Sequence, residues 1–277
     1  NRIRRTTLLL KNAANYTGNE PIDQYVGEAL FFRAYFHFEL VQLFGDVIIV
    51  KDVMDINSPE MWKERDNRGD VIDFIIQDLR EAVAKLPDTA PENGRINKYV
   101  AYSFLSRVAL YEGTWQKFRG NASRGKELCN IAVDAAKEVI DNGGYELFAP
   151  AALGTMAYKY LFTLEDEQST PVPGLTKASN KEYIFYRRHD NDLSRFNINI
   201  THGAVANAFL INRKFVNMYL SSDGLPIEKS PAFQGYATMN SEFQNRDNRM
   251  DNCFLYNGEK YWVNDPGSCR IDWKGMD

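Results

Sequence analysis

The chain has 277 residues, of which 44% are hydrophobic and 25% are charged, and its formal net charge is -4 at pH 7. This composition supports a large packed core and argues against disorder, and the net negative charge gives no electrostatic basis for binding nucleic acid. No stretch reaches the roughly 20 consecutive apolar residues of a membrane span. The three cysteines are too few for a disulfide-stapled fold or a structural zinc site, and their spacing leaves open whether Cys253 and Cys269 pair.

The first strongly patterned helix is predicted over residues 27–44, GEALFFRAYFHFELVQLF, and Gly45 is expected to end it. Polar side chains occupy one narrow face, and Arg33 and His37, spaced i,i+4, lie nearly opposite. The remainder is apolar, which is typical of a central helix packed on both flanks. We therefore expect Phe36 to be buried and Arg33 to pair with a core carboxylate or carbonyl groups. The alternative is that Arg33 and His37 face a groove that binds a partner.

Three more helices are predicted at residues 71–86, 98–112 and 124–142, each with an apolar stripe at helical spacing. Each is preceded by a residue type that caps helices and followed by a proline or glycine: Asp70 and Pro87, Asn97 and Gly113, Ser123 and Gly143. The last two helices form a hairpin similar to a tetratricopeptide unit, although the period of about 34 residues and its signature are absent. The expected scaffold is therefore a degenerate tetratricopeptide-like repeat.

From Tyr145 onward, loops rich in proline, glycine, serine and threonine separate short runs of high β-propensity. These runs are residues 182–188, 252–256 and 260–263. One further helix is expected around residues 204–220. The predicted fold class is mainly α, a degenerate tetratricopeptide-like scaffold with long irregular loops and a few short β-strands. We expect a single domain over residues 1–277, with the scaffold mainly in 1–148 and a loop-rich ligand-binding part mainly in 149–277.

The sequence carries no signature of an enzyme, a metal site or a cofactor. It contains no nucleophile elbow, His-Glu-x-x-His, phosphate-binding loop or dinucleotide fingerprint. A glycoside hydrolase would need two carboxylates, one of them in surroundings that keep it protonated. Pairs such as Glu165 with Asp166 and Asp190 with Asp192 fall in polar loops, which do not provide such surroundings. The loops rich in Asp and Asn do not follow the order of an EF-hand and are interpreted as polar turns.

Seven segments follow one another in a characteristic order: GEALFFRAYFHFELVQLFGDV, DLREAVAKLP, NKYVAYSFLSRVALYEGTW, AAKEVIDNGGYELF, NKEYIF, FVNMYLSSDGLPI and NRDNRM. In this order they resemble the SusD/RagB family of outer-membrane lipoproteins of Bacteroidetes, which capture nutrients. The resemblance covers roughly residues 2–250. Two segments depart from the family pattern: Tyr183 stands where the family has isoleucine, and Asn248 stands where it usually has proline.

The resemblance implies a protein that is not an enzyme and that binds oligosaccharides or polysaccharides at the cell surface. Uptake would follow through a SusC-type TonB-dependent transporter, which is the expected protein partner. The resemblance also implies a lipid anchor in the outer membrane, on a cysteine outside this segment, because family members are longer. Two alternatives remain: a peptide-binding lid of the same kind of transporter, and a helical-repeat interaction scaffold.

Candidate ligand contacts are chosen from composition and loop position, because the contacts of the family vary between its members. Aromatic rings pack on the apolar face of a sugar ring, while amides, carboxylates and guanidinium groups bind its hydroxyls. The candidates are Trp262, Tyr261, Tyr186, Arg188, His189, Asn191, Phe196 and Tyr236. Trp262 is the preferred stacking platform, and Trp115, just past a predicted helix end, fits either a core or a binding role. The sequence does not indicate which glycan is bound.

Overall fold

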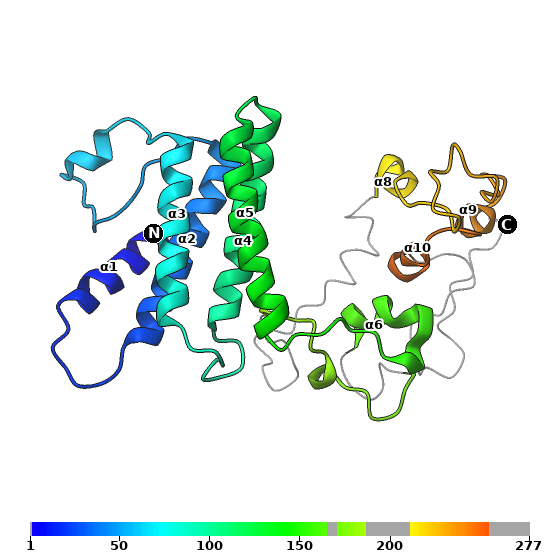
Figure 1. The fold of residues 1–277 in the computed structure, drawn as a ribbon, viewed down its shortest axis with the longest axis horizontal. Coiled ribbons are helices and arrows are strands. Elements are labelled where there is room, and N and C mark those ends of the chain that lie inside the picture. The colour runs from blue at the N-terminus through cyan, green and yellow to red at the C-terminus, as the bar shows by residue number, and fades with distance from the viewer. Residues whose placement is uncertain (1, 165–170, 187–210, 255–277) are drawn as a thin grey trace. The chain divides into compact units, whose positions relative to one another are not determined.

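The computed structural model of the chain describes residues 2–164, 171–186 and 211–254. The chain divides into two compact units (Figure 1). Unit 1 comprises Asn1–Tyr145 and Tyr183–Arg188, and unit 2 comprises Glu146–Glu182 and His189–Asp277. The first boundary between the units follows Tyr145, where the sequence was expected to change from helical patterns to loops. The expectation that the whole chain forms one domain stays a prediction.

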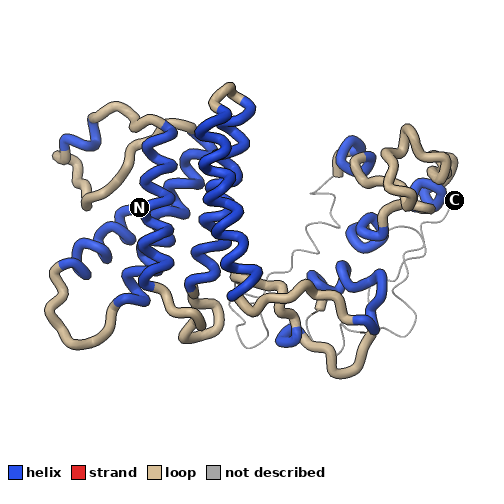
Figure 2. Tube along the Cα trace, viewed as in Figure 1, coloured by secondary structure: helices blue, strands red, loops and turns tan. Residues whose placement is uncertain are grey.

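The described residues are mainly helical and contain no β-strand (Figure 2). Their only β-type pairings are two isolated bridges, between Val47 and Asp66 and between Ser221 and Arg246. The predicted mainly α fold class is therefore confirmed, whereas the tetratricopeptide-like character of the scaffold stays a prediction.

Two predicted β-strands fall partly on described residues, and over those residues the prediction is wrong. Residues 182–186 are irregular, and the run that begins at Asn252 starts inside helix α10 (Asn248–Cys253). Asp247 caps this helix, because its carboxylate accepts a hydrogen bond from a backbone N–H of the first turn. The cap and the tertiary packing outweigh the β-propensity of the sequence here. The third predicted strand, 260–263, lies outside the described residues.

The described part of unit 1 is a row of helices: α1 (Arg2–Ala14), α2 (Asp23–Phe44), the short 3-10 helix η1 (Pro59–Trp62), α3 (Arg68–Lys85), α4 (Lys98–Phe118) and α5 (Ala122–Asn142). Helix α1 packs on α2, α2 on α3, α3 on α4 and α4 on α5. The long helices thus lie side by side (Figure 1). Their facing sides bury one continuous apolar core, to which α2, α3, α4 and α5 all contribute.

The two apolar flanks of α2 are buried to different extents. Phe38 is 2% exposed and Ala34 is fully buried. Phe36, in contrast, is only half-buried and lines a surface groove with Leu40. The expectation of a buried Phe36 is therefore wrong. The short helix α1 covers this flank only in part, and the guanidinium of Arg2 lies 5.6 Å from the centre of the Phe36 ring.

Arg33 pairs with a core carboxylate, as predicted. Its Nε and Nη2 donate hydrogen bonds to the two carboxylate oxygens of Asp78 on α3, both at 2.7 Å. Asp78 is 2% exposed, and burial raises its pKa in spite of the neighbouring Arg33. The Arg33 guanidinium also lies over the Phe74 ring, 5.0 Å from its centre. Arg33 therefore joins α2 to α3 and does not face a ligand groove.

His37 joins α2 to the segment that follows it. The side chain is fully buried, its Nδ1 lies 2.8 Å from the carbonyl oxygen of Arg33, and its Nε2 lies 3.2 Å from the Val50 nitrogen. Because Val50 donates its N–H to Nε2, the ring carries its proton on Nδ1 and donates it to Arg33. The imidazole is thus neutral, and burial lowers its pKa to about 4.

This buried imidazole makes the stability of unit 1 depend on pH. The pKa of His37 is about 4 in the folded chain and 6.5 in its ordinary state, so its contribution is complete above pH 6.5 and is lost as the pH falls toward 4. We expect a loss of up to about 3 kcal/mol in the free energy of unfolding over this window. Asp78, with a raised pKa, acts in the opposite direction. Urea unfolding of the native chain and of His37→Gln, each at pH 7 and pH 4.5, isolates the histidine because Asp78 is common to both. Equal pH dependence in the two proteins would contradict this assignment.

Three predicted helix-end residues are confirmed: Gly45 at the end of α2, Asn97 at the start of α4 and Gly143 at the end of α5. Two predicted N-caps are wrong. Helix α3 is capped by Asn67 and not by Asp70, and α5 is capped by Asn121 and not by Ser123. In both cases an asparagine slightly upstream accepts a hydrogen bond from an N–H of the first turn, so the helix begins earlier than predicted.

The predicted end of a helix at Gly113 is also wrong, because α4 continues to Phe118. Gly113 faces α5, where a Cβ atom on it would lie 2.9 Å from the Cys129 Sγ and 3.1 Å from the Gly125 carbonyl oxygen. The glycine therefore permits the close approach of two helices and does not end one.

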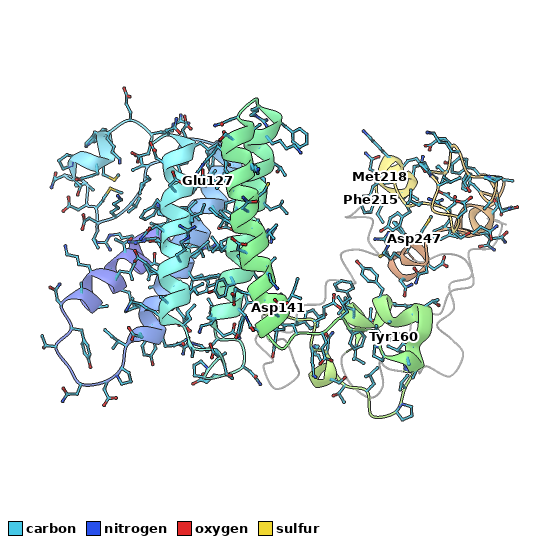
Figure 3. The ribbon with its side chains drawn as sticks, in the orientation of Figure 1. Glu127, Asp141, Tyr160, Phe215, Met218 and Asp247 are labelled. Atoms are coloured by element: carbon cyan, nitrogen blue, oxygen red, sulfur yellow. The ribbon has the colours of Figure 1, made fainter. Side chains whose placement is uncertain are left out.

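The described part of unit 2 consists of short helices joined by long loops: η2 (Ala151–Met156), α6 (Ala157–Thr163), η3 (Lys177–Ser179), α8 (Arg213–Asn217), α9 (Met239–Phe243) and α10. Asn252 joins α10 to the start of α6, since its side chain accepts a hydrogen bond from the Lys159 N–H at 3.0 Å. Tyr160 of α6 is buried, whereas Phe215 and Met218 project from the region of α8 (Figure 3). Of the helix predicted around residues 204–220, only Arg213–Asn217 is helical in the described residues; residues 211–212 and 218–220 are not helical, and residues 204–210 lie outside the described ranges.

Candidate functional site

A pocket of about 370 Å³ lies at α8 and α9 in unit 2 and is called the α8–α9 pocket below. It is lined by Ile211, Arg213, Val216, Tyr236, Thr238, Glu242, Phe243 and Phe254. A polar organic ligand needs apolar area together with a few convergent hydrogen-bonding groups, and this lining offers both. The groove of about 470 Å³ between α1 and α2 is larger but mostly apolar. We therefore take the α8–α9 pocket as the candidate site.

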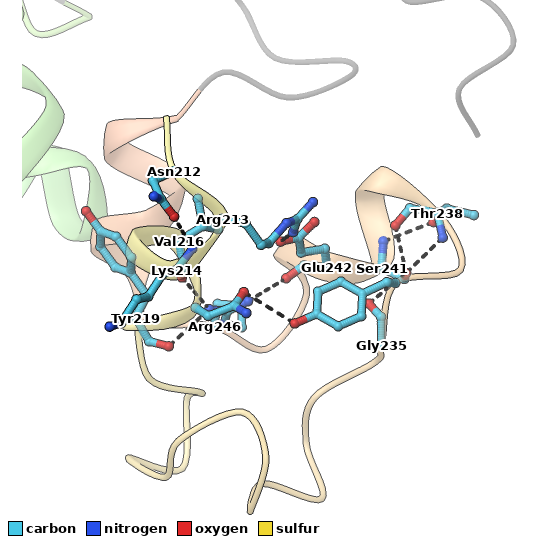
Figure 4. Close-up of polar contacts among 12 residues, drawn as sticks. Asn212, Arg213, Lys214, Val216, Tyr219, Gly235, Thr238, Ser241, Glu242 and Arg246 are labelled. Carbon is cyan, nitrogen blue, oxygen red and sulfur yellow. Dashed lines mark hydrogen bonds and ion pairs between the residues drawn. The ribbon is translucent and has the colours of Figure 1, made fainter. Parts of the chain in front are cut away.

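Side-chain caps fix the two helices that carry the pocket. The Asn212 side chain accepts a hydrogen bond from the Lys214 N–H at 2.8 Å and begins α8. Thr238 and Ser241 form a capping box at α9, in which each side chain accepts a hydrogen bond from the other's N–H, at 3.0 and 3.1 Å. Ser241 also donates to the Gly235 carbonyl oxygen at 3.2 Å, which ties the loop before α9 to the helix (Figure 4).

Tyr236 supplies an exposed aromatic ring. It is 53% exposed, and its hydroxyl donates a hydrogen bond to the Asn217 side-chain oxygen at 3.3 Å. The edge of its ring packs against Phe233, with 5.1 Å between ring centres, and the Arg213 guanidinium lies 5.4 Å from its centre. These contacts hold the ring in place while about half of it stays accessible.

Arg213 and Glu242 form an ion pair that lines the same pocket. The Arg213 side chain is 62% exposed and that of Glu242 is 11% exposed. The hydrogen bond to Glu242 raises the pKa of Arg213. The pair therefore presents guanidinium donors and a carboxylate acceptor close together.

Arg246 holds α8 and α9 in their relative position. It is 5% exposed, and its Nη2 donates to the carbonyl oxygens of Val216 at 3.1 Å and Tyr219 at 3.0 Å. Its Nη1 donates to the carbonyl oxygen of Glu242 at 3.1 Å (Figure 4). The Val216 carbonyl oxygen also accepts the Tyr219 N–H at 3.3 Å, and the buried guanidinium adds a charged donor to the carbonyl groups at the end of α8. Burial lowers the pKa of Arg246.

The NRDNRM segment, which carries part of the family resemblance, thus has a structural task. Asp247 caps α10 and pairs with Arg249 at 2.6 Å. It follows Arg246, whose hydrogen bonds to the carbonyl oxygens of α8 and α9 are called the Arg246 clamp below. Figure 3 shows Asp247 beside α10. The segment builds the frame behind the pocket and does not line it.

Of the residues predicted to bind ligand, the structure places Tyr236 in the α8–α9 pocket. Tyr186 is 44% exposed and belongs to unit 1, where its ring lies 6.2 Å from that of Tyr183. The other predicted ligand contacts lie outside the described residues: Trp262, Tyr261, Arg188, His189, Asn191 and Phe196. The sequence reasoning missed Arg213 and Glu242. Arg213 lies just before the FVNMYL segment and Glu242 just before NRDNRM, but the sequence carries no signal that these two residues pair.

The two described tryptophans are placed very differently. Trp115 lies under two guanidinium groups, with the Arg68 and Arg119 carbons 4.0 and 3.3 Å from a ring centre, so it is not an open stacking surface. Trp62 of η1 is 83% exposed. Its exposure had no signal in the sequence, because it sits in a loop without hydrophobic periodicity.

Within the described residues, no cluster of three or more His, Cys, Asp or Glu side chains is arranged to hold a metal ion. None of the described helices is long and apolar enough to cross a membrane. Cys253 is exposed, and Cys269 lies outside the described residues, so the structure does not test whether the two pair.

The sequence of residues 1–110 matches a SusD-like family described as starch-binding and associating with the outer membrane. A SusD-like protein of Bacteroides ovatus is 28% identical over 123 residues, which is 44% of this chain and 21% of that protein. The SusD-like protein P2 of Formosa agariphila is 32% identical over 113 residues, or 39% of this chain and 22% of that protein.

Solved structures extend the likeness to nearly the whole fold. A SusD-like protein of Bacteroides fragilis matches with a TM-score of 0.71 and 23% identity, over 99% of this chain and 52% of its own. A SusD-like carbohydrate binding protein of the same species matches with a TM-score of 0.61 and 22% identity, over 93% of this chain and 45% of its own.

The described residues form a mainly helical protein whose α8–α9 pocket is lined by aromatic, apolar and charged side chains. Residues 1–110 match the SusD-like family, and almost the entire chain shares the fold of a solved SusD-like protein. This confirms the resemblance seen in the sequence. The chain spans about half the length of these solved structures, and its alignments cover about a fifth of the curated relatives. The α8–α9 pocket lies beyond the residues that match the family sequence.

Proposed function

We propose that the chain binds oligosaccharides or polysaccharides without catalysis, and that the α8–α9 pocket contributes to this binding. The main observation in support of this proposal is the exposed Tyr236 ring beside the Arg213–Glu242 pair. An aromatic face packs on the apolar side of a pyranose ring, and a guanidinium and a carboxylate serve its hydroxyls. The family description as starch-binding, and the solved relative named as a carbohydrate binding protein, support the same ligand class.

A non-catalytic role fits the chemistry of this pocket. Glycoside hydrolysis needs two carboxylates on either side of the scissile bond. The described lining contains one carboxylate, Glu242, and it is engaged by Arg213. Binding alone is therefore the role that these side chains support.

The wider setting is also a proposal. The family description as associating with the outer membrane supports a position at the cell surface, where a lipid anchor would hold the protein. Delivery to a SusC-type TonB-dependent transporter, the partner that the family resemblance implies, would follow capture. Trp262, Tyr261 and the other predicted contacts outside the described residues stay candidates for the same ligand.

Replacing Tyr236 by Ala should weaken glycan binding by about 1–3 kcal/mol, on the scale of aromatic stacking against a ring. Isothermal titration of the full chain with a panel of plant, host and fungal oligosaccharides measures this loss. Tyr25→Ala is the matched control, because it removes a tyrosine of unit 1 that is 52% exposed and is not a candidate ligand contact, and it should leave affinity unchanged. A chain that binds peptides but no glycan would instead be a peptide-binding lid. Binding of neither class would favour an interaction scaffold.

A further inference from the structure

The charge of the α8–α9 pocket limits which sugars it accepts. Arg213 and Glu242 are the charged residues among the described side chains that line it, and they form an ion pair with each other. We propose that the pocket is selective for neutral sugar rings with adjacent hydroxyls, and against uronic acid or sulfated sugars. This inference rests on the proposed glycan-binding function.

The Arg213–Glu242 pair offers a hydrogen-bond donor and an acceptor to two neighbouring sugar hydroxyls. A hydroxyl group both donates and accepts, so one hydroxyl can accept from a guanidinium N–H while its neighbour donates to a carboxylate oxygen. Arg213 has five N–H donors and is 62% exposed, so donors remain for a ligand after the bond to Glu242. Tyr236 provides the apolar surface beside this pair, since the Arg213 guanidinium lies 5.4 Å from its ring centre.

An acidic sugar would be repelled by the Glu242 carboxylate. A ligand carboxylate that approaches Arg213 must also approach Glu242, and juxtaposed like charges are strongly unfavourable at a partly buried site. The second guanidinium nearby, that of Arg246, does not line the pocket and is directed at three backbone carbonyl oxygens. Its Nη groups are therefore already hydrogen-bonded to oxygen acceptors, and its Nε, which has no hydrogen-bond partner among the described residues, is buried, so neither is exposed to a ligand acid.

Glu242 is thus the residue that excludes anions. Glu242→Gln keeps the size of the side chain and the backbone carbonyl to which Arg246 donates, but it leaves Arg213 without its counter-charge. This variant should bind oligouronates at least about tenfold more tightly than the native chain, because a ligand carboxylate replaces the lost one. Arg213→Gln is the matched control: it should weaken neutral sugars and should gain nothing toward uronates.

The test is titration of the native chain with matched pairs of hexasaccharides, neutral glucans and xylans against oligogalacturonate, oligoguluronate and sulfated galactan. Binding of a neutral oligosaccharide, with the acidic members at least about tenfold weaker, supports the inference. Acidic members that bind as tightly as or more tightly than neutral ones overturn the selectivity and leave glycan binding standing. Absence of binding by every sugar overturns the proposed function itself. If Glu242→Gln gains no affinity for uronates while its circular dichroism and thermal midpoint match the native chain, Glu242 is not the excluding residue.

Discussion

Replacing Asp78 by Leu should lower the free energy of unfolding by about 3–5 kcal/mol, because it leaves the Arg33 guanidinium buried without its carboxylate. Both ends of this pair are shielded from water, with side-chain exposures of 12% for Arg33 and 2% for Asp78. The raised pKa of Asp78 shows that burial costs its carboxylate more than the Arg33 interaction returns. The loss therefore comes mainly from the stranded charge and not from the pair as such. Urea unfolding at pH 7, followed by far-UV circular dichroism, measures it.

Two further variants distinguish the cost of the unpaired Arg33 charge from the cost of altered packing at Asp78. Arg33→Met combined with Asp78→Leu removes both charges and should recover most of the loss, as an apolar pair of similar volume does. Asp23→Asn, which breaks the exposed Lys85–Asp23 pair, should change the free energy by less than about 1 kcal/mol. A double variant as unstable as Asp78→Leu alone would show that shape, and not charge, dominates at this position.

Phe38→Ala should cost about 3–5 kcal/mol, because the ring is 2% exposed and its removal leaves a cavity in the core of unit 1. Phe104 and Tyr111 of α4 contact it edge-on, with ring centres 5.6 and 5.4 Å away, so the cavity would open between α2 and α4. Phe36→Ala, two residues earlier, should cost only about 1 kcal/mol, since that ring is half-buried beside a groove.

The pair of phenylalanine variants gives an internal comparison within one helix. Both remove the same atoms from the same helix, so the difference in their free energies of unfolding reports the unequal burial and contacts of the two rings. Urea unfolding curves with equal midpoints for the two variants would contradict the unequal burial of the two flanks of α2.

The scaffold could be predicted well because its signals are local. The position of Arg33 inside an apolar helix led to the expectation of a buried carboxylate or carbonyl partner, and Asp78 is that partner. The helix ends were predicted wrongly where one residue type can serve two structural roles. Asp70 has the chemistry of a cap, yet Asn67 is better placed for it, and Gly113 serves helix packing and not helix termination.

The candidate site was less accessible from sequence, because it depends on contacts between distant residues. Tyr236 was found by its loop position and aromatic character. Arg213 and Glu242 are 29 positions apart and are ordinary charged residues when read singly, so their pairing follows only from the fold. The clamp of Arg246 shows the same limit, since a buried guanidinium that binds carbonyl oxygens has no sequence pattern of its own.

The three hydrogen bonds of Arg246 all end on backbone oxygens, of Val216, Tyr219 and Glu242. Every amino acid has a backbone oxygen, so the side chains at these three positions can change without removing a single bond of the clamp. The side chains that line the pocket can therefore vary, while the Arg246 hydrogen bonds that position α8 and α9 stay the same. A library randomised at Arg213, Tyr236 and Glu242, with Arg246 kept, would therefore be a practical way to retarget this pocket to new ligands.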